Sequence, residues 1–215
     1  MTDMIQNLKD IVLNFDIDNA EAMAKAAINS GLAPVLAANA LTDAIRDVGD
    51  RFGKGELYLP DLVCASEVLK KAFPIINEAI EAGGSSQSSL GKVVIGTVFG
   101  DIHSIGKSMV ATLLYAAGFK VIDLGIDVDY SVFVDAIKQY KPDIVAFSGL
   151  LTTTLANIPE HIKAIEDAGL RKSVALAVGG APVTQHFADM YGIEIYAPDA
   201  SSAAKEFIKV MGAKQ

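Results

Sequence analysis

Five short apolar runs alternate with amphipathic segments through the C-terminal part of the chain. The runs cover residues 92–97, 119–124, 143–148, 173–178 and 193–196, and helical patterns over about 106–117, 130–140, 154–168, 182–190 and 200–211 follow them. This alternation is typical of β-α-β units, in which buried strands form a parallel sheet that helices cover on both faces. The sequence therefore predicts an α/β domain with five parallel strands in the flavodoxin-like (Rossmann-like) order 2-1-3-4-5.

The preceding residues, 1–82, have a helical pattern instead. Pro34 and Pro60 suit the first turns of two helices, and Gly53-Lys54-Gly55 separates them. Pro74 lies inside the last pattern and is expected to kink that helix. Four helices with short connections predict a small four-helix bundle at the N-terminus.

A glycine- and serine-rich segment, Gly-Gly-Ser-Ser-Gln-Ser-Ser at residues 83–89, separates the two patterns. Its composition is that of a flexible linker, although a surface loop has the same composition. We favour the linker, because the periodicity changes completely across it. The predicted organisation is a helical domain over 1–82, a linker over 83–90 that also serves as a hinge, and an α/β domain over 91–215.

Charge and composition argue against several classes of partner. The chain has 18 Lys and Arg against 26 Asp and Glu, a net charge of −8, whereas nucleic-acid binding requires clustered basic residues. We expect no membrane span, because no apolar run reaches about 18 residues. We also expect no signal peptide, since a basic head and an apolar segment are missing at the start. Cys64 is the single cysteine, which suits a reducing cytoplasm.

The segment Asp101-Ile102-His103-Ser104-Ile105-Gly106 follows the first predicted strand directly. An aspartate two residues before a histidine can accept the Nδ1–H and leave Nε2 free to bind a metal. Ser148-Gly149-Leu150 and Gly179-Gly180 follow the third and fourth strands. Because the carboxyl ends of parallel strands share one edge, these three segments are expected to form one ligand site.

His103 is the candidate metal ligand, although a lone loop histidine is often just a surface residue. No second or third ligand stands at zinc spacing, and His161 and His186 lie in predicted helices, where we expect them to be exposed. A single protein ligand therefore predicts a metal that brings its other ligands with it, such as the metal of a macrocycle.

The glycines at this edge allow two interpretations. Gly106, Gly149, Gly179 and Gly180 could serve turn geometry alone, or they could leave room for a ligand that a Cβ would block. In the second case a slot between the sheet and the helices would accept a long, flat group.

The hydroxyl-rich segment from Ser148 to Thr154 is equally open. Ser148 or Thr152 could cap a helix, and Thr153 could either do the same or bind a buried ligand or Asp101.

Taken in order, Asp101-Ile-His103-Ser-Ile-Gly106, Ser148-Gly-Leu150 and Gly179-Gly180 resemble the cobalamin-binding signature of corrinoid proteins from methylamine and methanol methyltransferase systems. The signature is also similar to that of the cobalamin module of methionine synthase. The segment Arg51–Pro60 looks like part of the helical cap of these proteins, so that the resemblance covers nearly the whole chain.

The resemblance implies that the cofactor is cobalamin or a related corrinoid, and that His103 is the lower axial ligand of cobalt. Asp101 would hydrogen-bond His103 and carry or relay its proton. Thr154 stands where the family often has a serine that continues the relay.

The resemblance also implies where the cofactor lies. Its detached nucleotide tail would occupy a slot formed by Ser104, Ile105, Gly106, Ser148, Leu150, Thr152, Gly179 and Gly180. Phe52, Leu59 and Leu62 would cover the upper face of the corrin, although their spacing also fits the core of the bundle.

The implied function is that of a methyl carrier with little turnover of its own. Its partners would be a substrate-specific methyltransferase, a second methyltransferase that uses tetrahydrofolate or coenzyme M, and an ATP-dependent reductive activase. A cobalamin-binding sensor is the main alternative, but the acidic chain shows no DNA-binding segment. The small subunit of a cobalamin-dependent mutase would lack the helical bundle, and a receiver domain would have an acidic pair after its first strand.

Overall fold

The computed structural model describes residues 2–82 and 89–212. The chain forms two compact units, one over residues 1–88 together with 115–117 and one over the remaining residues. Residues 83–88 of the predicted linker lie outside the described residues.

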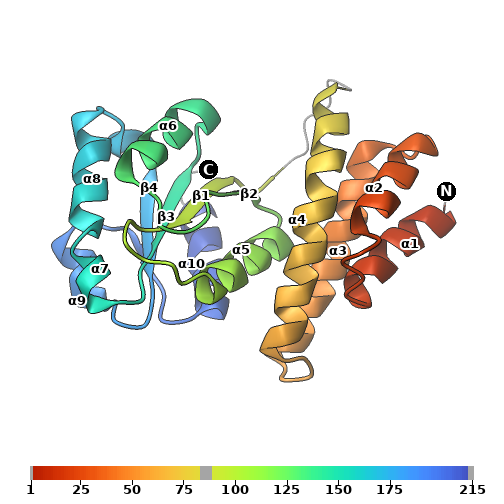
Figure 1. Cartoon of the computed structure of the whole chain (residues 1–215), viewed down its shortest axis with the longest axis horizontal. Coiled ribbons are helices and arrows are strands. Elements are labelled where there is room, and N and C mark those ends of the chain that lie inside the picture. The colour runs from red at the N-terminus through yellow and green to blue at the C-terminus, as the bar shows by residue number, and fades with distance from the viewer. Residues whose placement is uncertain (1, 83–88, 213–215) are drawn as a thin grey trace. The chain divides into compact units, whose positions relative to one another are not determined.

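The N-terminal unit contains the four predicted helices (Figure 1). They are α1 (Thr2–Leu13), α2 (Ala20–Asn29), α3 (Pro34–Gly53) and α4 (Leu59–Ala82). Helix α3 packs against α1 and α4, and α2 packs against α4. Alanines and leucines such as Ala24, Leu41 and Leu69 fill the contacts and are fully buried.

Local sequence explains where these helices begin and end. Pro34 occupies the first turn of α3, where its missing N–H costs no hydrogen bond. Gly31 follows α2 with a φ of +80°, a conformation that glycine adopts without strain. Pro74 lies inside α4, which continues through it as one helix.

The C-terminal unit alternates strands and helices. Its elements are β1 (Lys92–Thr97), α5 (Ile105–Ala117), β2 (Lys120–Asp123), α6 (Tyr130–Tyr140), β3 (Ile144–Ser148), α7 (Thr152–Leu155), α8 (Ile158–Asp167), the 3₁₀ turn η1 (Arg171–Ser173), β4 (Ala175–Gly179), α9 (Gln185–Met190), β5 (Ile195–Tyr196) and α10 (Ala200–Gly212).

The five strands form one parallel sheet in the order β2-β1-β3-β4-β5, as the sequence predicts. The order reverses at β1, whose neighbours are β2 and β3. The register pairs Thr97 of β1 with Ser148 of β3, and Ser148 with Gly179 of β4. Three of the predicted site segments therefore begin side by side at the carboxyl edge of the sheet.

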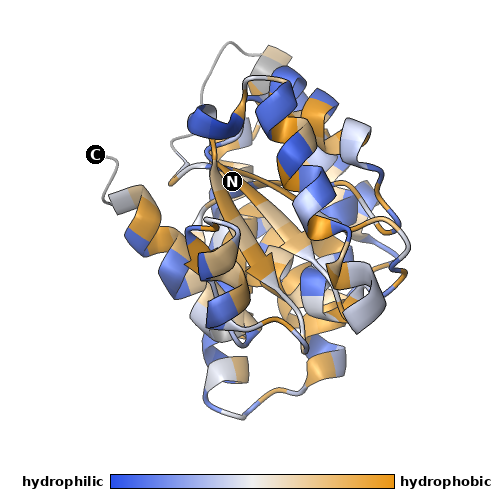
Figure 2. Ribbon diagram, turned by 90° about the vertical axis from the view of Figure 1, so that its left-hand side faces the viewer, coloured by the Kyte–Doolittle hydropathy of each residue, from blue (hydrophilic) through white to orange (hydrophobic). Residues whose placement is uncertain are grey.

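The sheet is apolar along its length, and helices cover it (Figure 2). Phe133 from α6, Ile158 and Ile165 from α8, and Ala188 from α9 pack with strand residues such as Phe147 in one buried cluster. Burial of both faces explains why the strands read as continuous apolar runs in the sequence.

One predicted helix is in fact two. The pattern over residues 154–168 was expected to form a single helix, but α7 ends at Leu155 and α8 begins at Ile158. Pro159 has no N–H to bond to a preceding turn, and it lies in the first turn of α8. The break places Asn157 at the start of α8.

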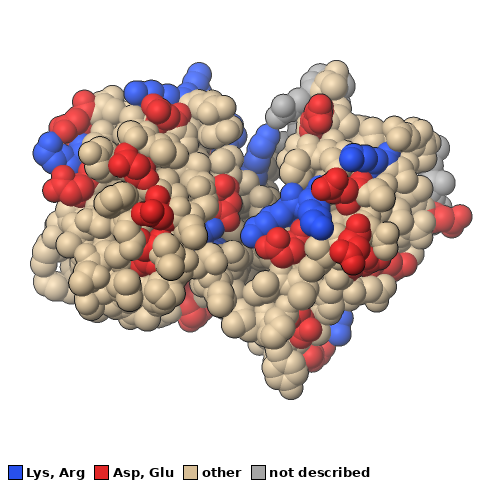
Figure 3. Space-filling view, in the orientation of Figure 1, with Lys and Arg blue, Asp and Glu red and all other residues tan. Residues whose placement is uncertain are grey.

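Acidic and basic side chains are interspersed on the face that Figure 3 shows, with no continuous basic surface there. None of the helices in the described part of the chain is long and apolar enough to cross a membrane.

Candidate functional site

The loop after β1 is held in place at several points along its backbone. The Oγ1 atom of Thr97 donates to the carbonyl oxygen of His103 over 2.8 Å, and Thr97 is fully buried. Gly100 has a φ of +80° and donates its N–H to Asp127 Oδ1 over 2.7 Å. The Asp127 N–H in turn donates to the carbonyl oxygen of Asp101 over 2.9 Å. The loop that carries Asp101 and His103 is therefore a fixed structure.

Asp101 is fully buried, and both of its carboxylate oxygens accept hydrogen bonds. Oδ1 accepts from the backbone N–H of His103 over 3.0 Å and lies 3.0 Å from His103 Nδ1. Oδ2 accepts from the N–H groups of Leu150 (2.7 Å) and Leu151 (3.3 Å) and from Thr154 Oγ1 (2.7 Å). One carboxylate thus joins the loop after β1 to the loop after β3.

These contacts set the charge of Asp101. Burial alone would raise its pKa, but hydrogen bonds from Leu150, His103 and Thr154 outweigh burial and lower the pKa far below the ordinary value of 3.8. Asp101 is therefore an anion at any physiological pH.

Of the two ring nitrogens of His103, Nδ1 contacts Asp101. Because Asp101 is an acceptor, Nδ1 carries the hydrogen, and Nε2 has no hydrogen-bond partner among the described residues. The His103 side chain is 48% exposed. In the described part of the chain, no group of three or more His, Cys, Asp or Glu side chains could hold a metal ion. A metal at Nε2 would need its other ligands from elsewhere.

The Thr154 hydroxyl donates to Oδ2 of Asp101, at the position where the family resemblance implies a relay residue. Thr154 is buried, and its hydroxyl contacts the carbonyl oxygen of Leu151 as well. Thr152 and Thr153, its neighbours in α7, are exposed. Leu151, rather than Ser148 or Thr152, stands at the N-cap of α7, and it makes no side-chain cap bond.

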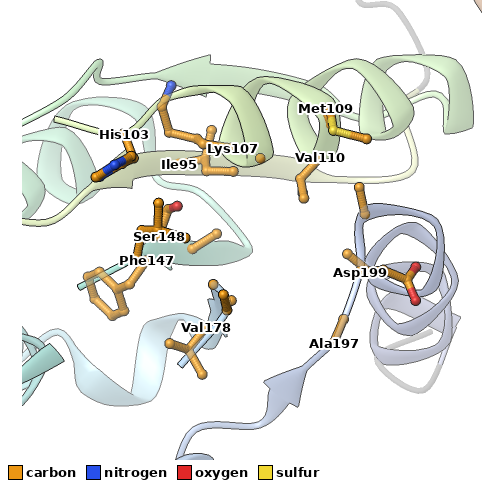
Figure 4. Close-up of a pocket in the computed structure, with 18 of the residues that line it drawn as sticks. Ile95, His103, Lys107, Met109, Val110, Phe147, Ser148, Val178, Ala197 and Asp199 are labelled. Atoms are coloured by element: carbon orange, nitrogen blue, oxygen red, sulfur yellow. The ribbon is translucent and has the colours of Figure 1, made fainter. Parts of the chain in front are cut away.

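A cavity of about 680 Å³ begins at His103 and lies between the carboxyl half of the sheet and the helices α5 and α10. Figure 4 shows His103 at one end, and Ala197 and Asp199 at the other. The predicted residues that line it are His103, Ser104, Ile105, Gly106, Ser148, Leu150, Gly179 and Gly180. Thr152 does not line it.

The glycines at this edge differ in what a side chain would meet. A Cβ on Gly106 would have no atom within 4 Å, and a Cβ on Gly179 would meet only the Ala197 carbonyl oxygen, at 3.8 Å. Gly180 has a φ of +135°, and its Cβ would lie 1.8 Å from the Gly149 carbonyl oxygen. The backbone therefore requires glycine at 180, whereas Gly106 and Gly179 leave space in the cavity.

The three predicted cap residues lie in the helical unit. Leu62 is 1% exposed within its core, Phe52 is half-buried, and Leu59 is exposed.

His161 is not exposed, contrary to the expectation from its place in a helix. It is fully buried, with Nδ1 2.7 Å from the carbonyl oxygen of Asn157 and Nε2 2.9 Å from that of Val128. The helical pattern misleads here because α8 turns this position toward the sheet. His186 is exposed, as expected.

The residues that line the far end of the cavity were not predicted from the sequence. Ala197, Asp199, Ala203 and Phe207 line it from the segment after β5 and from α10. Lys107 of α5 lines the cavity near His103 (Figure 4), and its ammonium pairs with Asp123. The only available signal was that residues 197–199 end the fifth strand at the same sheet edge.

Two family models match the chain, the B12 binding domain over residues 91–207 and a second B12 binding domain model over residues 4–77. The trimethylamine corrinoid protein of Methanosarcina barkeri is 43% identical over 94% of this chain and 93% of its own length.

Two solved structures are also similar. A chain of the methanol:cobalamin methyltransferase complex MtaBC from Methanosarcina barkeri is 26% identical, with a TM-score of 0.77 over 98% of this chain and 80% of that one. A cobalamin-binding protein from Desulfitobacterium hafniense is 29% identical, with a TM-score of 0.61 over 96% and 98%. The chain therefore belongs to the family of B12-binding corrinoid proteins of methylamine and methanol methyltransferase systems.

Proposed function

We propose that this protein is a methyl carrier that binds cobalamin or a related corrinoid with the cofactor's own base detached and His103 in its place on cobalt. One observation carries the proposal. His103 keeps Nε2 available while buried, anionic Asp101 holds Nδ1, and a long cavity opens beside the ring.

The residues of the cavity fit the detached tail of such a cofactor. A volume of about 680 Å³ lies within the range of small-molecule sites, which is roughly 300–1,000 Å³. Gly106 is the second residue of α5, and glycine is a poorer helix former than alanine. The backbone conformation does not require glycine at this position, and a Cβ there would meet no protein atom within 4 Å. We therefore attribute this glycine to the space that a ligand needs.

A bound corrinoid supplies the cobalt atom that holds the methyl group. The chain's own residues bind and orient it. The tail would lie against Ser104, Gly106, Ser148 and Gly179, with Leu150 near His103. Asp101 fixes the orientation of the imidazole, and Thr154 fixes the carboxylate.

Asp101 would hold the His103 ring through Nδ1. Hydrogen bonds from Leu150, His103 and Thr154 keep the pKa of Asp101 low and its carboxylate ionised, so that an anion orients the imidazole. The family resemblance implies that Asp101 would also carry or relay the proton of His103.

The helical unit would cover the methyl-bearing face. Leu59 and Phe52 are exposed or half-buried and could contact a corrin directly. Leu62 is inside the bundle and would support them from within.

The partners we propose are a substrate-specific methyltransferase, a second methyltransferase that uses tetrahydrofolate or coenzyme M, and an ATP-dependent reductive activase, all in the cytoplasm. The similar chain in the methanol:cobalamin methyltransferase complex supports a methyltransferase partner. The second methyltransferase and the activase are proposed from the family resemblance.

The test is an EPR spectrum of uniformly ¹⁵N-labelled protein, reconstituted with hydroxocobalamin and reduced to Co(II). A hyperfine pattern that changes from ¹⁴N to ¹⁵N on labelling would show that a protein nitrogen is the axial ligand. A pattern that ignores the label would mean that the cofactor keeps its own base, which would contradict the proposal.

Two variants identify the nitrogen. His103→Ala should lose the protein coupling and could still retain corrinoid through the tail. His186→Ala removes an exposed histidine from α9 and should behave as the unchanged protein.

A further inference from the structure

His161 links two segments that hold the Asp101 loop, yet it lies outside the cavity. It belongs to α8, and its Nε2 is 2.9 Å from the carbonyl oxygen of Val128, 33 residues earlier in the chain. The rings of Tyr130, Phe133 and Phe147 surround it, with centroids 5.2–6.2 Å away. Both ring nitrogens of His161 face carbonyl oxygens, which only accept, and the ring donates to Val128 in the tautomer or protonated form that carries a hydrogen on Nε2.

On the α8 side, a series of polar contacts leads from His161 to Asp101 through the turn between α7 and α8. Nδ1 of His161 faces the carbonyl oxygen of Asn157, and the side chain of Asn157 donates to the carbonyl oxygen of Phe99 over 2.8 Å. The N–H of Asn157 donates to the carbonyl oxygen of Thr154, whose hydroxyl donates to Asp101.

On the other side, the contacts return to the same loop. Val128 donates its N–H to the carbonyl oxygen of Thr97, and the neighbouring Asp127 contacts both Gly100 and Asp101. The Asp101 loop is thus held between two segments, and the contact between the His161 side chain and the Val128 carbonyl oxygen connects one segment to the other.

We propose that His161 is a positioning residue, whose Nε2–H bond to Val128 keeps the Asp101 carboxylate in register with His103. The alternative is that a flat ring merely fills this part of the core. The two differ in one respect, because only the positioning role requires a hydrogen-bond donor at Nε2.

The titratable group that faces His161 from the β2–α6 segment is Asp129, with Tyr130 next to it. Hydrogen bonds from Ser131, with a smaller effect of His161, lower the pKa of Asp129. Strand β3 contributes only Phe147. On α8 itself, the positions three and four residues away are Asn157, Ile158, Ala164 and Ile165, and none of them titrates. Among the described residues, neither Asp129 nor Tyr130 hydrogen-bonds the ring, whose two nitrogens face backbone carbonyl oxygens.

The experiment compares His161→Phe, which keeps a ring without a donor, with His161→Gln, which keeps a donor that can reach Val128. Amide hydrogen exchange at Leu150 and Gly100 is followed by NMR in the corrinoid-free protein. His161→Phe should speed exchange at both amides about five- to tenfold, the factor for one buried hydrogen bond, and His161→Gln should restore much of the protection. His186→Phe is the control and should change neither rate.

Equal exchange in the Phe variant and the unchanged protein, or equal loss in the Phe and Gln variants, would overturn the proposal. If His161→Phe does not fold, the ¹⁵N spectrum of the unchanged protein decides, because an unprotonated Nε2 on His161 would contradict it.

The consequence for the cofactor rests on the proposed function and is measured separately. His161→Phe should lower the fraction of reconstituted protein that shows axial nitrogen coupling. If the unchanged protein itself shows no such coupling, the proposed function fails, while the exchange result still tests the positioning role alone.

Discussion

Thr154 donates its hydroxyl to Oδ2 of Asp101 over 2.7 Å, whereas His103 lies 3.0 Å from Oδ1 of the same carboxylate. The two side chains come from segments about 50 residues apart and use different oxygens. Either side chain can therefore be substituted while the oxygen that the other contacts stays in place, so that the two contacts can be tested separately.

Removing the Thr154 hydroxyl should weaken the site and the fold together. Thr154→Val keeps the shape but leaves Asp101 with one donor fewer, so that its pKa rises and the free energy of unfolding falls by about 1–3 kcal/mol. Urea unfolding at neutral pH measures the change. Thr154→Ser should retain stability better, and Thr153→Val, at an exposed neighbour, should have no comparable effect. Equal losses at positions 153 and 154 would refute the prediction.

Acid should remove a part of the stability that belongs to Asp101. Its pKa is lower in the folded protein than the ordinary 3.8, so that the unfolded chain binds the proton first as the pH falls. The contribution is complete well above pH 4 and declines with acidification below it. The free energy of unfolding of the unchanged protein minus that of Asp101→Asn should therefore be constant from pH 7 to about pH 5 and shrink toward pH 3. A difference that is the same at all these pH values would contradict a depressed pKa.

Gly106→Ala should separate binding from folding. The new methyl group meets no protein atom within 4 Å and favours the helix, so that the melting temperature should stay the same or rise slightly. Corrinoid affinity should fall about tenfold or more, because the methyl group projects into the cavity. Equilibrium titration with hydroxocobalamin provides the dissociation constant. Gly212→Ala, also at an open helical position, is the control, and an unchanged affinity in Gly106→Ala would exclude this part of the tail site.

Gly180→Ala should have the opposite character. Its φ of +135° costs about 1–3 kcal/mol for a residue with a Cβ, and the overlap with the Gly149 carbonyl oxygen adds to that cost. Thermal unfolding should show a clear loss of stability. Gly179→Ala, one residue earlier, has ordinary contacts only and should unfold close to the unchanged protein. Similar melting temperatures for the two variants would show that the strand end relaxes around position 180.

The parallel strands were predictable because burial on both faces gives each strand a continuous apolar run, and their order was predicted from the flavodoxin-like architecture that alternating strands and helices favour. The Asp101–His103 contact was predictable from spacing, since two residues place a carboxylate next to an imidazole in a tight loop. Thr154 was placed by resemblance, and spacing alone favoured it no more than its neighbours. Only the tertiary fold brings it to Asp101, across two segments.

Other features depend on packing that a single sequence does not reveal. The buried state of His161 follows from which side of α8 meets the sheet, and the split of the 154–168 pattern follows from where Pro159 begins a new helix. Gly180 differs from Gly106 in its φ of +135° and in the position of Gly149, which directly follows β3. The two glycines therefore look alike in the sequence, although the structure gives each a different reason.

Helix α10 forms a wall of the cavity through Ala203 and Phe207, and it is the last helix of the described chain. A ligand that fills the cavity would touch both the loop after β1 and this helix, and would fasten the end of the domain to its beginning. Ligand binding would then protect the C-terminal helix from proteases. Limited proteolysis could therefore measure the fraction of protein with ligand bound, without any signal from the metal.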